Sequence, residues 1–479
     1  MSFLYQFVIL IGLSIGVISN NVEPLNNFAN QHVMNNNPVN NPTNTFNNPV
    51  LPKNLHPAVN KLQPDNINHR SNNFNEKNFD KNDDNTAQSN LIIDETRSID
   101  QLIVDYGYSF NKYYVTTSDG YILTIHRIKN PCLSDEPLDP IILGHPATQD
   151  GSIFIDGSPF YNPISCSTGA VDEPFNPNLG FLLADLGYDV FMPSFRGFRY
   201  SRNHTDYNPA KDAEYWDFTS DEMGKYDAPA IVDFVLGLST YPEVIWIGHS
   251  LGVSIPLILL ATQPSYEEKI RHVIGLAPTT FLGHTTHPST RYWADSGLGK
   301  EKQTEFGPKE DNKTTTKRES IVANRASNES LTKLSRQYFY DFGYDPAQTN
   351  VTRLPVFYAQ QTQTSLSTYV HFSQLACTPY FKAFDGGKKR NTREYGKPKP
   401  PFYKISQIRN VTFTIMASPN DKVAKLNDVK KLVKTLKAPV DLKIVKYKKM
   451  NHFGFLWSLN RQKLVNDVIV DTLNEVISS

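Results

Sequence analysis

The sequence predicts an α/β fold in which a mostly parallel central sheet is interrupted by one long insertion. Short apolar segments alternate with helical patterns along most of the chain, which is typical of parallel strands covered by helices on both faces. The alternation lapses over 281–400 and then resumes. A serine, an aspartate and a histidine each follow one of the predicted strands, so chemistry is expected at the carboxyl edge of this sheet.

The N-terminal part of the chain differs in composition from the rest. Residues 3–18 form an apolar run shorter than a membrane span, and Val17 and Ser19 are small enough for a signal-peptidase site. We therefore expect a signal peptide over 1–19 and no integral membrane segment after its removal. A membrane anchor or a buried helix is the alternative, because no Lys or Arg precedes the run. Residues 20–92 are rich in Asn and Pro, which predicts a disordered leader; an interaction or propeptide segment is the alternative.

Charge and cysteine content narrow the function classes. The 48 basic and 48 acidic residues balance, so nothing favours nucleic acid as a partner. The three cysteines, Cys132, Cys166 and Cys377, allow one disulfide at most. One bridge with a free thiol and three structural thiols are both open.

The expected elements follow in chain order. A hairpin over 113–128 turns at 118–120, where Gly120 permits a positive φ. A buried strand over 141–145 precedes a helix and a further buried strand within 178–193. The segment 221–238 has helical periodicity, with Met223, Ile231 and Phe234 on its core face. The remaining elements are a strand at 244–248, a helix at 253–262, strands at 273–278 and 411–416, a helix at 427–437, a strand at 442–447 and a helix at 461–477.

These elements divide the chain into a core and an insertion. Residues 93–280 and 401–479 carry the regular α/β pattern and are expected to form one core. Residues 281–400 contain a charged, Thr-rich stretch and short helix-like runs. An insertion of this length predicts a cap or lid over the carboxyl edge of the sheet.

The strongest motif is Gly-His-Ser-Leu-Gly at 248–252. The pattern G-x-S-x-G is weak alone, but here a buried strand precedes it and an apolar helix follows, which is the setting of a nucleophile elbow. The flanking glycines allow neighbouring backbone to approach, and the strained turn lifts the serine hydroxyl above the sheet edge. Ser250 is therefore the predicted nucleophile of an α/β-hydrolase fold.

The partners of the serine should follow in the order acid, then histidine. Asp421 lies just after strand 411–416 and His452 just after strand 442–447. His452 is expected to take the serine proton, and Asp421 to hold the histidine tautomer. Asp428 is the competing acid, but it falls on the following helix. His249 adjoins the serine in sequence, yet the turn should point successive side chains apart.

An acyl hydrolase also needs hydrogen-bond donors for the tetrahedral oxyanion. The backbone N–H of Leu251, directly after the nucleophile, is one expected donor. The other should come from the loop after strand 141–145. Pro146 has no N–H, so Ala147 is the expected donor in that loop.

Five Asn-x-Ser/Thr sequons accompany the predicted signal peptide. They are Asn203, Asn312, Asn328, Asn350 and Asn410. Asn is abundant in this chain, so chance is the alternative. The sequons support a secreted, extracellular or lysosomal location.

The stretch from about 93 to 475 resembles the acid lipases, the group of gastric lipase and lysosomal acid lipase. The resemblance rests on VTTSDGYIL, LADLGYDVFMPSFRG, EYWDFTSDEMGKYDAPAIVDF, GHSLG, PNDKVAKLNDV and NHFGFLW, in this order. It implies a Ser250–His452–Asp421 triad, a cap over a deep acyl pocket, activity at acidic pH and no cofactor or metal. The chain departs from the family at Pro146, where the family has Gly, and at Leu251, where it has Gln. The proline puts the geometry of the oxyanion loop in question.

The resemblance predicts a serine ester hydrolase that acts on lipid esters, triacylglycerols or cholesteryl esters, at a transient lipid–water interface. Two alternatives stay open. One is an esterase or acyltransferase for smaller esters, which a narrow or open cap would favour. The other is a lipid-binding or storage protein with reduced catalysis, although the retained Ser250, Asp421 and His452 argue against it.

Overall fold

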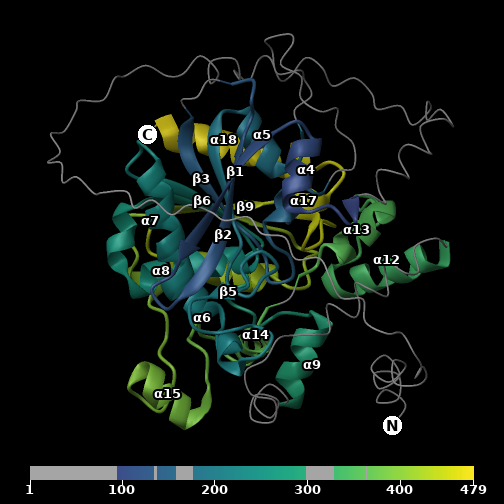
Figure 1. Ribbon diagram of the computed structural model, residues 1–479. Coiled ribbons are helices and arrows are strands. Elements are labelled where there is room, and N and C mark those ends of the chain that lie inside the picture. The colour runs from purple at the N-terminus through teal and green to yellow at the C-terminus, as the bar shows by residue number, and fades with distance from the viewer. Residues whose placement is uncertain (1–93, 134–136, 158–175, 298–327, 363, 479) are drawn as a thin grey trace, which may run out of the picture. The chain divides into compact units, whose positions relative to one another are not determined.

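The computed structural model describes residues 94–133, 137–157, 176–297, 328–362 and 364–478 (Figure 1). The predicted signal peptide and leader lie outside these residues. Within them, a nine-stranded mixed sheet has the order β1-β2-β4-β3-β6-β7-β8-β9, and β5 pairs with β2. The predicted α/β class with a mostly parallel sheet is confirmed.

The antiparallel end of the sheet begins with the predicted hairpin. Helix α4 (Ile99–Asp105) leads into β1 (Ser109–Thr116) and β2 (Tyr121–Lys129), which pair antiparallel. Gly120 has a φ of 96° between them, a conformation that favours glycine. Strand β2 also pairs antiparallel with β4 (Tyr188–Pro193) and with the short β5 (Asn203–His204). The hairpin therefore closes one edge of the parallel part.

The parallel part carries the predicted site. It runs through β4, β3 (Leu138–Gly144), β6 (Val244–His249), β7 (Ile270–Leu276), β8 (Thr412–Ala417) and β9 (Val440–Ile444). Every residue of β4 and β6 is buried, as expected for strands covered on both faces. Because these strands are parallel, the segments that follow β3, β6, β8 and β9 begin at one edge of the sheet.

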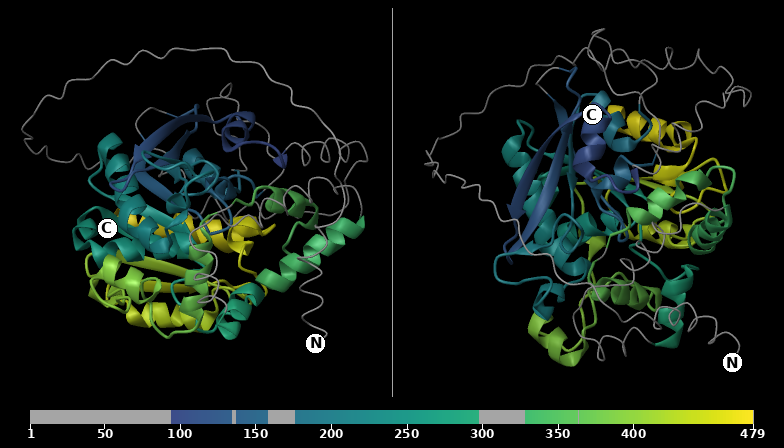
Figure 2. Two further views of the ribbon diagram at one scale, coloured as in Figure 1. Left: turned by 60° about the horizontal axis from the view of Figure 1, so that its bottom comes forward. Right: turned by 45° about the vertical axis from the view of Figure 1, so that its right-hand side comes forward.

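Helices cover both faces of the sheet. Helix α8 (Leu251–Thr262) packs on β3, β6 and β7, and α5 (Leu179–Asp185) packs on β2 and β4. In the right-hand view of Figure 2, α18 (Asp467–Ser478, yellow) lies across the sheet from the teal helices. The other core helices are η2 (Gly151–Phe154), η4 (Ala213–Trp216), α6 (Ser220–Glu222), η5 (Met223–Asp227), α7 (Ala228–Leu238), η6 (Pro264–Glu268), η8 (Ile405–Gln407), α16 (Leu426–Thr435), α17 (Gly454–Trp457) and η9 (Gln462–Asn466).

The segment 221–238 differs from the single regular helix that its periodicity predicts. A π-helical turn, η5, separates α6 from α7. Pro229 has no N–H for a helical hydrogen bond, and the Gln263 side chain donates instead to the Lys225 carbonyl at 2.9 Å. Met223 and Ile231 are fully buried as predicted, whereas Phe234 is only half-buried.

The described part of 281–400 contributes helices and no strand to the sheet. These helices are α9 (Pro288–Ser296), α12 (Asn328–Phe342), η7 (Val351–Arg353), α13 (Leu354–Ala359), α14 (Leu366–Ala376) and α15 (Gly387–Tyr395). Most of them lie below or to the right of the sheet in Figure 1. The charged, Thr-rich stretch of the insertion falls mainly outside the described residues.

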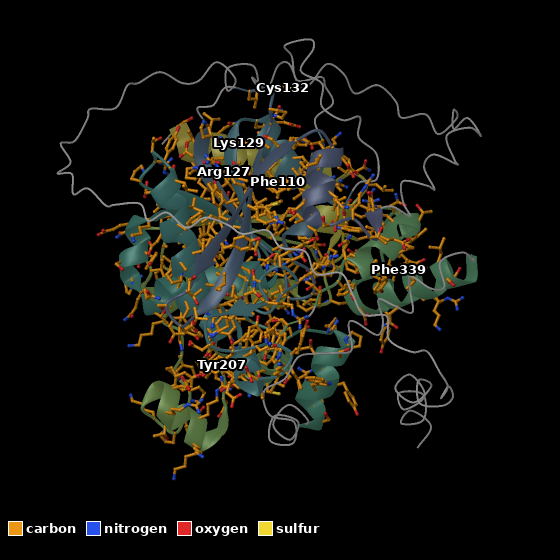
Figure 3. The ribbon with its side chains drawn as sticks, in the orientation of Figure 1. Phe110, Arg127, Lys129, Cys132, Tyr207 and Phe339 are labelled. Atoms are coloured by element: carbon orange, nitrogen blue, oxygen red, sulfur yellow. The ribbon has the colours of Figure 1, made fainter. Side chains whose placement is uncertain are left out.

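The structure decides between the two alternatives for the cysteines, one disulfide with a free thiol or three structural thiols. Cys132, which Figure 3 shows just beyond the end of β2, is disulfide-bonded. Cys377, at the end of α14, is an exposed free thiol. One bridge with a free thiol is therefore confirmed over three structural thiols.

None of the described helices is both long enough and apolar enough to cross a membrane.

Candidate active site

Ser250 lies in a sharp turn between β6 and α8. Its φ of 57° and ψ of −113° are sparsely populated by residues other than glycine, so the surrounding structure must hold the turn. The Ser250 N–H donates to the Leu276 carbonyl at 2.9 Å, and its own carbonyl accepts from the N–H groups of Val253 and Thr279. These contacts join the serine to the end of β7 and to the first turn of α8.

The two glycines of the motif are required by close backbone contacts. A Cβ atom on Gly252 would lie 2.0 Å from the Gly144 carbonyl oxygen, and one on Gly248 would lie 2.3 Å from the Gly252 carbonyl oxygen. Real Cβ atoms do not approach backbone so closely, so a side chain at either position would displace the turn. The first turn of α8 can therefore pack directly on the end of β3.

The structure brings Ser250, His452 and Asp421 together, although 202 residues separate the serine from the histidine. The His452 Nε2 atom lies 3.0 Å from the Ser250 Oγ atom, and Nδ1 lies 2.8 Å from the Asp421 Oδ2 atom. Both distances suit hydrogen bonds. In this arrangement Nδ1–H can donate to the carboxylate while Nε2 accepts the serine proton.

The Asp421 carboxylate is oriented by its own loop. Its Oδ1 atom accepts hydrogen bonds from the backbone N–H groups of Val423 at 2.7 Å and Ala424 at 2.8 Å, which leaves Oδ2 for His452. The competing acid Asp428 lies on α16. It instead accepts from the backbone N–H of His284 at 2.8 Å and pairs with the His284 ring at 2.7 Å.

The cluster is buried and contacts a residue of the insertion. Ser250 is 5% exposed, Asp421 1% and His452 2%. The Phe342 ring, at the end of α12, stacks on the His452 ring with centroids 6.4 Å apart, and its carbonyl accepts from the N–H groups of His452 and Lys422. The end of α12 therefore contacts both loops that supply the partners of Ser250.

His249 does not bond to Ser250, as predicted, but it contacts His452. Its Nε2 atom lies 2.9 Å from the His452 carbonyl oxygen, and the two rings are 4.9 Å apart. Burial lowers the pKa of His249 well below its ordinary value. A neutral His249 can donate from Nε2 and so hold the backbone of His452.

The loop after β3 is held by several contacts despite Pro146. Burial lowers the pKa of His145 to about 4, and the neutral ring accepts from the Phe195 N–H at 3.0 Å and donates to the Pro146 carbonyl at 2.8 Å. The Tyr369 hydroxyl donates to the Ala147 carbonyl at 2.9 Å. The start of this loop lies against Gly252, next to Leu251. The oxyanion roles of Leu251 and Ala147 stay predictions.

The sequons differ in accessibility. Asn203 and Asn410 are exposed, and Asn350 is half-buried with its side-chain oxygen accepting from Thr352 at 2.7 Å. Asn312 and the side chain of Asn328 lie outside the described part of the chain.

Across the described residues, no group of three or more His, Cys, Asp or Glu side chains could hold a metal ion.

Three contacts at the site were not predicted from the sequence. Phe342 and Tyr369 belong to the insertion, where no motif marks them. Trp246 was interpreted only as part of a buried strand, yet its indole nitrogen donates to the Gly252 carbonyl at 2.8 Å. The available signal for that contact was the proline four residues after Gly252.

Comparison with known proteins first defines the class. The family model described as "alpha/beta hydrolase fold" matches residues 167–459, and the model "Partial alpha/beta-hydrolase lipase region" matches residues 99–157. A solved structure from Sulfolobus solfataricus has the same fold with a TM-score of 0.52 at 15% identity, covering 77% of this chain and 95% of that one.

Sequence relatives then define the family. Mouse lipase member K is 32% identical over 75% of this chain and 85% of its own length. Rat gastric triacylglycerol lipase is 30% identical over 78% of this chain and 90% of its own length. The chain belongs to the acid-lipase family of the α/β hydrolases, as its motifs predicted.

Proposed function

We propose that this protein is a serine ester hydrolase that cleaves carboxylic esters of lipids, triacylglycerols or cholesteryl esters, through an acyl-enzyme intermediate. The observation that carries the proposal is the pair of hydrogen bonds made by His452. Its Nε2 atom lies 3.0 Å from Ser250 Oγ, and its Nδ1 atom lies 2.8 Å from Asp421 Oδ2. Ser250 lies in a strained turn between a buried strand and a helix, which is where this fold presents a nucleophile.

In the first half of the reaction, the Ser250 oxygen attacks the ester carbonyl while His452 Nε2 takes its proton. Asp421 stabilises the imidazolium that forms. The backbone N–H groups of Leu251 and Ala147 stabilise the negative oxygen of the tetrahedral intermediate. The imidazolium then gives its proton to the leaving alcohol, and the acyl group stays on Ser250.

In the second half, water takes the place of the alcohol. His452 removes a proton from the water, which attacks the acyl carbonyl, and then returns a proton to Ser250 as the fatty acid leaves. His249 and Asp421 hold His452 from its backbone and its ring, so the imidazole keeps its orientation through both halves.

Two observations support a lipid ester as the substrate. The relatives include gastric triacylglycerol lipases. The proposed catalytic residues are almost inaccessible, and Phe342 of the insertion stacks on His452, which supports our proposal that 281–400 is a cap. An enclosed site excludes bulk water from the long acyl chain and favours burial of its apolar surface.

We propose a secreted or lysosomal location. Support comes from the apolar run over 3–18, the exposed sequons Asn203 and Asn410, and the disulfide at Cys132. The gastric lipases among the relatives fit the same compartments.

The proposal is tested by active-site labelling and by ester hydrolysis. A fluorophosphonate probe should label the wild type and fail to label Ser250→Ala, because only an activated serine oxygen attacks the phosphorus. Emulsified long-chain triacylglycerol should be cleaved faster than soluble short-chain esters, with the assay run from pH 4 to 8. Labelling that survives Ser250→Ala would overturn the catalytic assignment. Activity confined to soluble short esters would replace the lipid substrate with a smaller ester.

A further inference from the structure

A proline in α8 leaves one backbone carbonyl of the nucleophilic turn without its helical donor. In a regular helix the carbonyl of Gly252 accepts from the N–H four residues later, but that residue is Pro256, which has no N–H. Gly252 is buried, so an unpaired carbonyl there would cost the desolvation of a polar group. The indole Nε1–H of Trp246 donates to this carbonyl at 2.8 Å.

The peptide unit that accepts from Trp246 also contacts the nucleophile. The carbonyl of Gly252 and the N–H of Val253 belong to the same planar peptide group. That N–H donates to the Ser250 carbonyl at 3.2 Å. Trp246 therefore contacts the backbone of Ser250 through one rigid peptide group. The helix itself offers no N–H to the carbonyl of this group, because residue 256 is proline.

The position of Trp246 suits this hydrogen bond, and its ring also stacks on Phe195 with centroids 6.5 Å apart. The residue lies on β6, is fully buried, and its indole nitrogen would be 2.8 Å from a Cβ atom at Gly144. The indole thus fills the space between the end of β3 and the first turn of α8. Strand β6 fixes the indole because it is hydrogen-bonded on both sides, to β3 and β7.

The chain uses the same arrangement once more within its described residues. The Lys225 carbonyl lies four residues before Pro229, and the Gln263 side chain donates to it at 2.9 Å. In both places a side chain from a neighbouring element replaces the N–H that a proline removes. At Gly252 the replaced hydrogen bond lies two residues from the nucleophile.

We propose that Trp246 is a positioning residue for the reaction. Its indole N–H holds the first turn of α8, and with it the Ser250 backbone and the Leu251 N–H, in the geometry that attack requires. Pro256 makes this hydrogen bond necessary. The proposal rests on the proposed function, because it assigns a role relative to Ser250 as nucleophile.

A double-mutant cycle tests the proposal. Trp246→Phe removes the donor and should lower kcat and the rate of fluorophosphonate labelling by at least about tenfold, with KM within about twofold, since small displacements of reacting groups reduce turnover strongly. Pro256→Ala restores the helical N–H and should stay within about threefold of wild type. In the Pro256→Ala background, Trp246→Phe should then cost less than about threefold, because the Gly252 carbonyl has a backbone donor.

Rescue by Pro256→Ala separates positioning from packing, since alanine at 256 does not refill the volume of the indole.

Trp457→Phe is the matched control: Trp457 is also buried, and its indole nitrogen has no hydrogen-bond partner among the described residues. Its kcat should stay within about threefold of wild type. If the double variant is as impaired as Trp246→Phe, or if Trp246→Phe retains full kcat, the proposal is overturned. Ser250→Ala tests the proposed function separately, because its outcome does not depend on Trp246.

If Trp246→Phe does not fold, the indole N–H signal of Trp246 provides the second measurement. The Trp246→Phe/Pro256→Ala double variant assigns this signal by its disappearance. Hydrogen exchange at the indole should be slow in the wild type and at least about tenfold faster in Pro256→Ala, where the backbone N–H competes for the carbonyl. Equal exchange rates in the two proteins would overturn the proposal.

Discussion

Replacing Asp421 with Asn should invert the tautomer of His452 while leaving the shape of the site unchanged. The Asp421 Oδ1 atom accepts from two backbone N–H groups, those of Val423 and Ala424. An Asn side chain must therefore place its carbonyl oxygen there, which turns its NH₂ group toward His452 Nδ1. That nitrogen then becomes an acceptor, and the ring proton moves to Nε2. A protonated Nε2 cannot take the proton of Ser250.

The expected loss follows from this tautomer. Removing the carboxylate charge with the geometry retained costs serine hydrolases with such a triad about 10⁴-fold in kcat, which corresponds to roughly 5 kcal/mol of transition-state stabilisation. The effect should fall on kcat with little change in KM, because the carboxylate contacts His452 and its own loop. Initial rates of p-nitrophenyl ester hydrolysis measure both constants over the required range.

Asp428→Asn is the matched control for the Asp421→Asn variant. Asp428 is a buried carboxylate of the same loop–helix segment, but it bonds to His284 rather than to His452. Its kcat should stay within about threefold of wild type. The reasoning would be refuted if Asp421→Asn kept more than about a tenth of wild-type kcat, or if Asp428→Asn lost more activity than Asp421→Asn.

Three further predictions concern stability and processing. Gly252→Ala would place a Cβ atom 2.0 Å from a backbone oxygen at the end of β3 and should abolish folding or activity. Gly237→Ala, whose Cβ atom would have nothing within 4 Å, should raise the melting temperature by a few degrees. The opposite ranking of the two variants in thermal melts would contradict the packing. Burial raises the pKa of Asp156 to about 8, so the folded protein keeps a proton that the unfolded chain releases near pH 4, and stability falls as the pH rises from about 4 to about 8. Asp156→Asn should lose less melting temperature than wild type between pH 5 and pH 8, and an equal or larger loss would show that Asp156 is not the titrating group. After expression through a eukaryotic secretory pathway, glycosidase treatment should reduce the mass of wild type, and Asn203→Gln and Asn410→Gln should each remove one glycan; an unchanged mass would argue against secretion.

The core of the fold and the sharp turn at Ser250 could be predicted from the sequence because both depend on local patterns. Buried parallel strands read as continuous apolar runs, and β6 and β8 fall within two residues of the predicted segments. The order of serine, acid and histidine along the chain follows from the order of strands in this fold. The contact of Asp421 rather than Asp428 with His452 could also be predicted, since a loop after a strand reaches the sheet edge and the next helix does not.

Contacts between distant segments could not be predicted in the same way. Tyr369 and the Ala147 carbonyl are 222 residues apart, and Phe342 reaches His452 from a helix with no motif. In the sequence, neither Tyr369 nor Phe342 differs from an ordinary core aromatic residue. The π-helical turn in 221–238 was missed because apolar residues still recur near the helical period across it, although Phe234 is half-buried rather than buried.

The site therefore combines two kinds of constraint with different consequences for function. The nucleophilic turn is held by backbone contacts within the core: the close approach of Gly252 to β3 and the hydrogen bond from Trp246. These contacts lie within the core and involve no residue of the insertion. The cover over His452 comes from Phe342, whose helix belongs to the insertion and contacts the core through a ring and a carbonyl. A change in the insertion can therefore alter the contacts of Phe342 with His452 while the hydrogen bonds among Ser250, His452 and Asp421 stay intact.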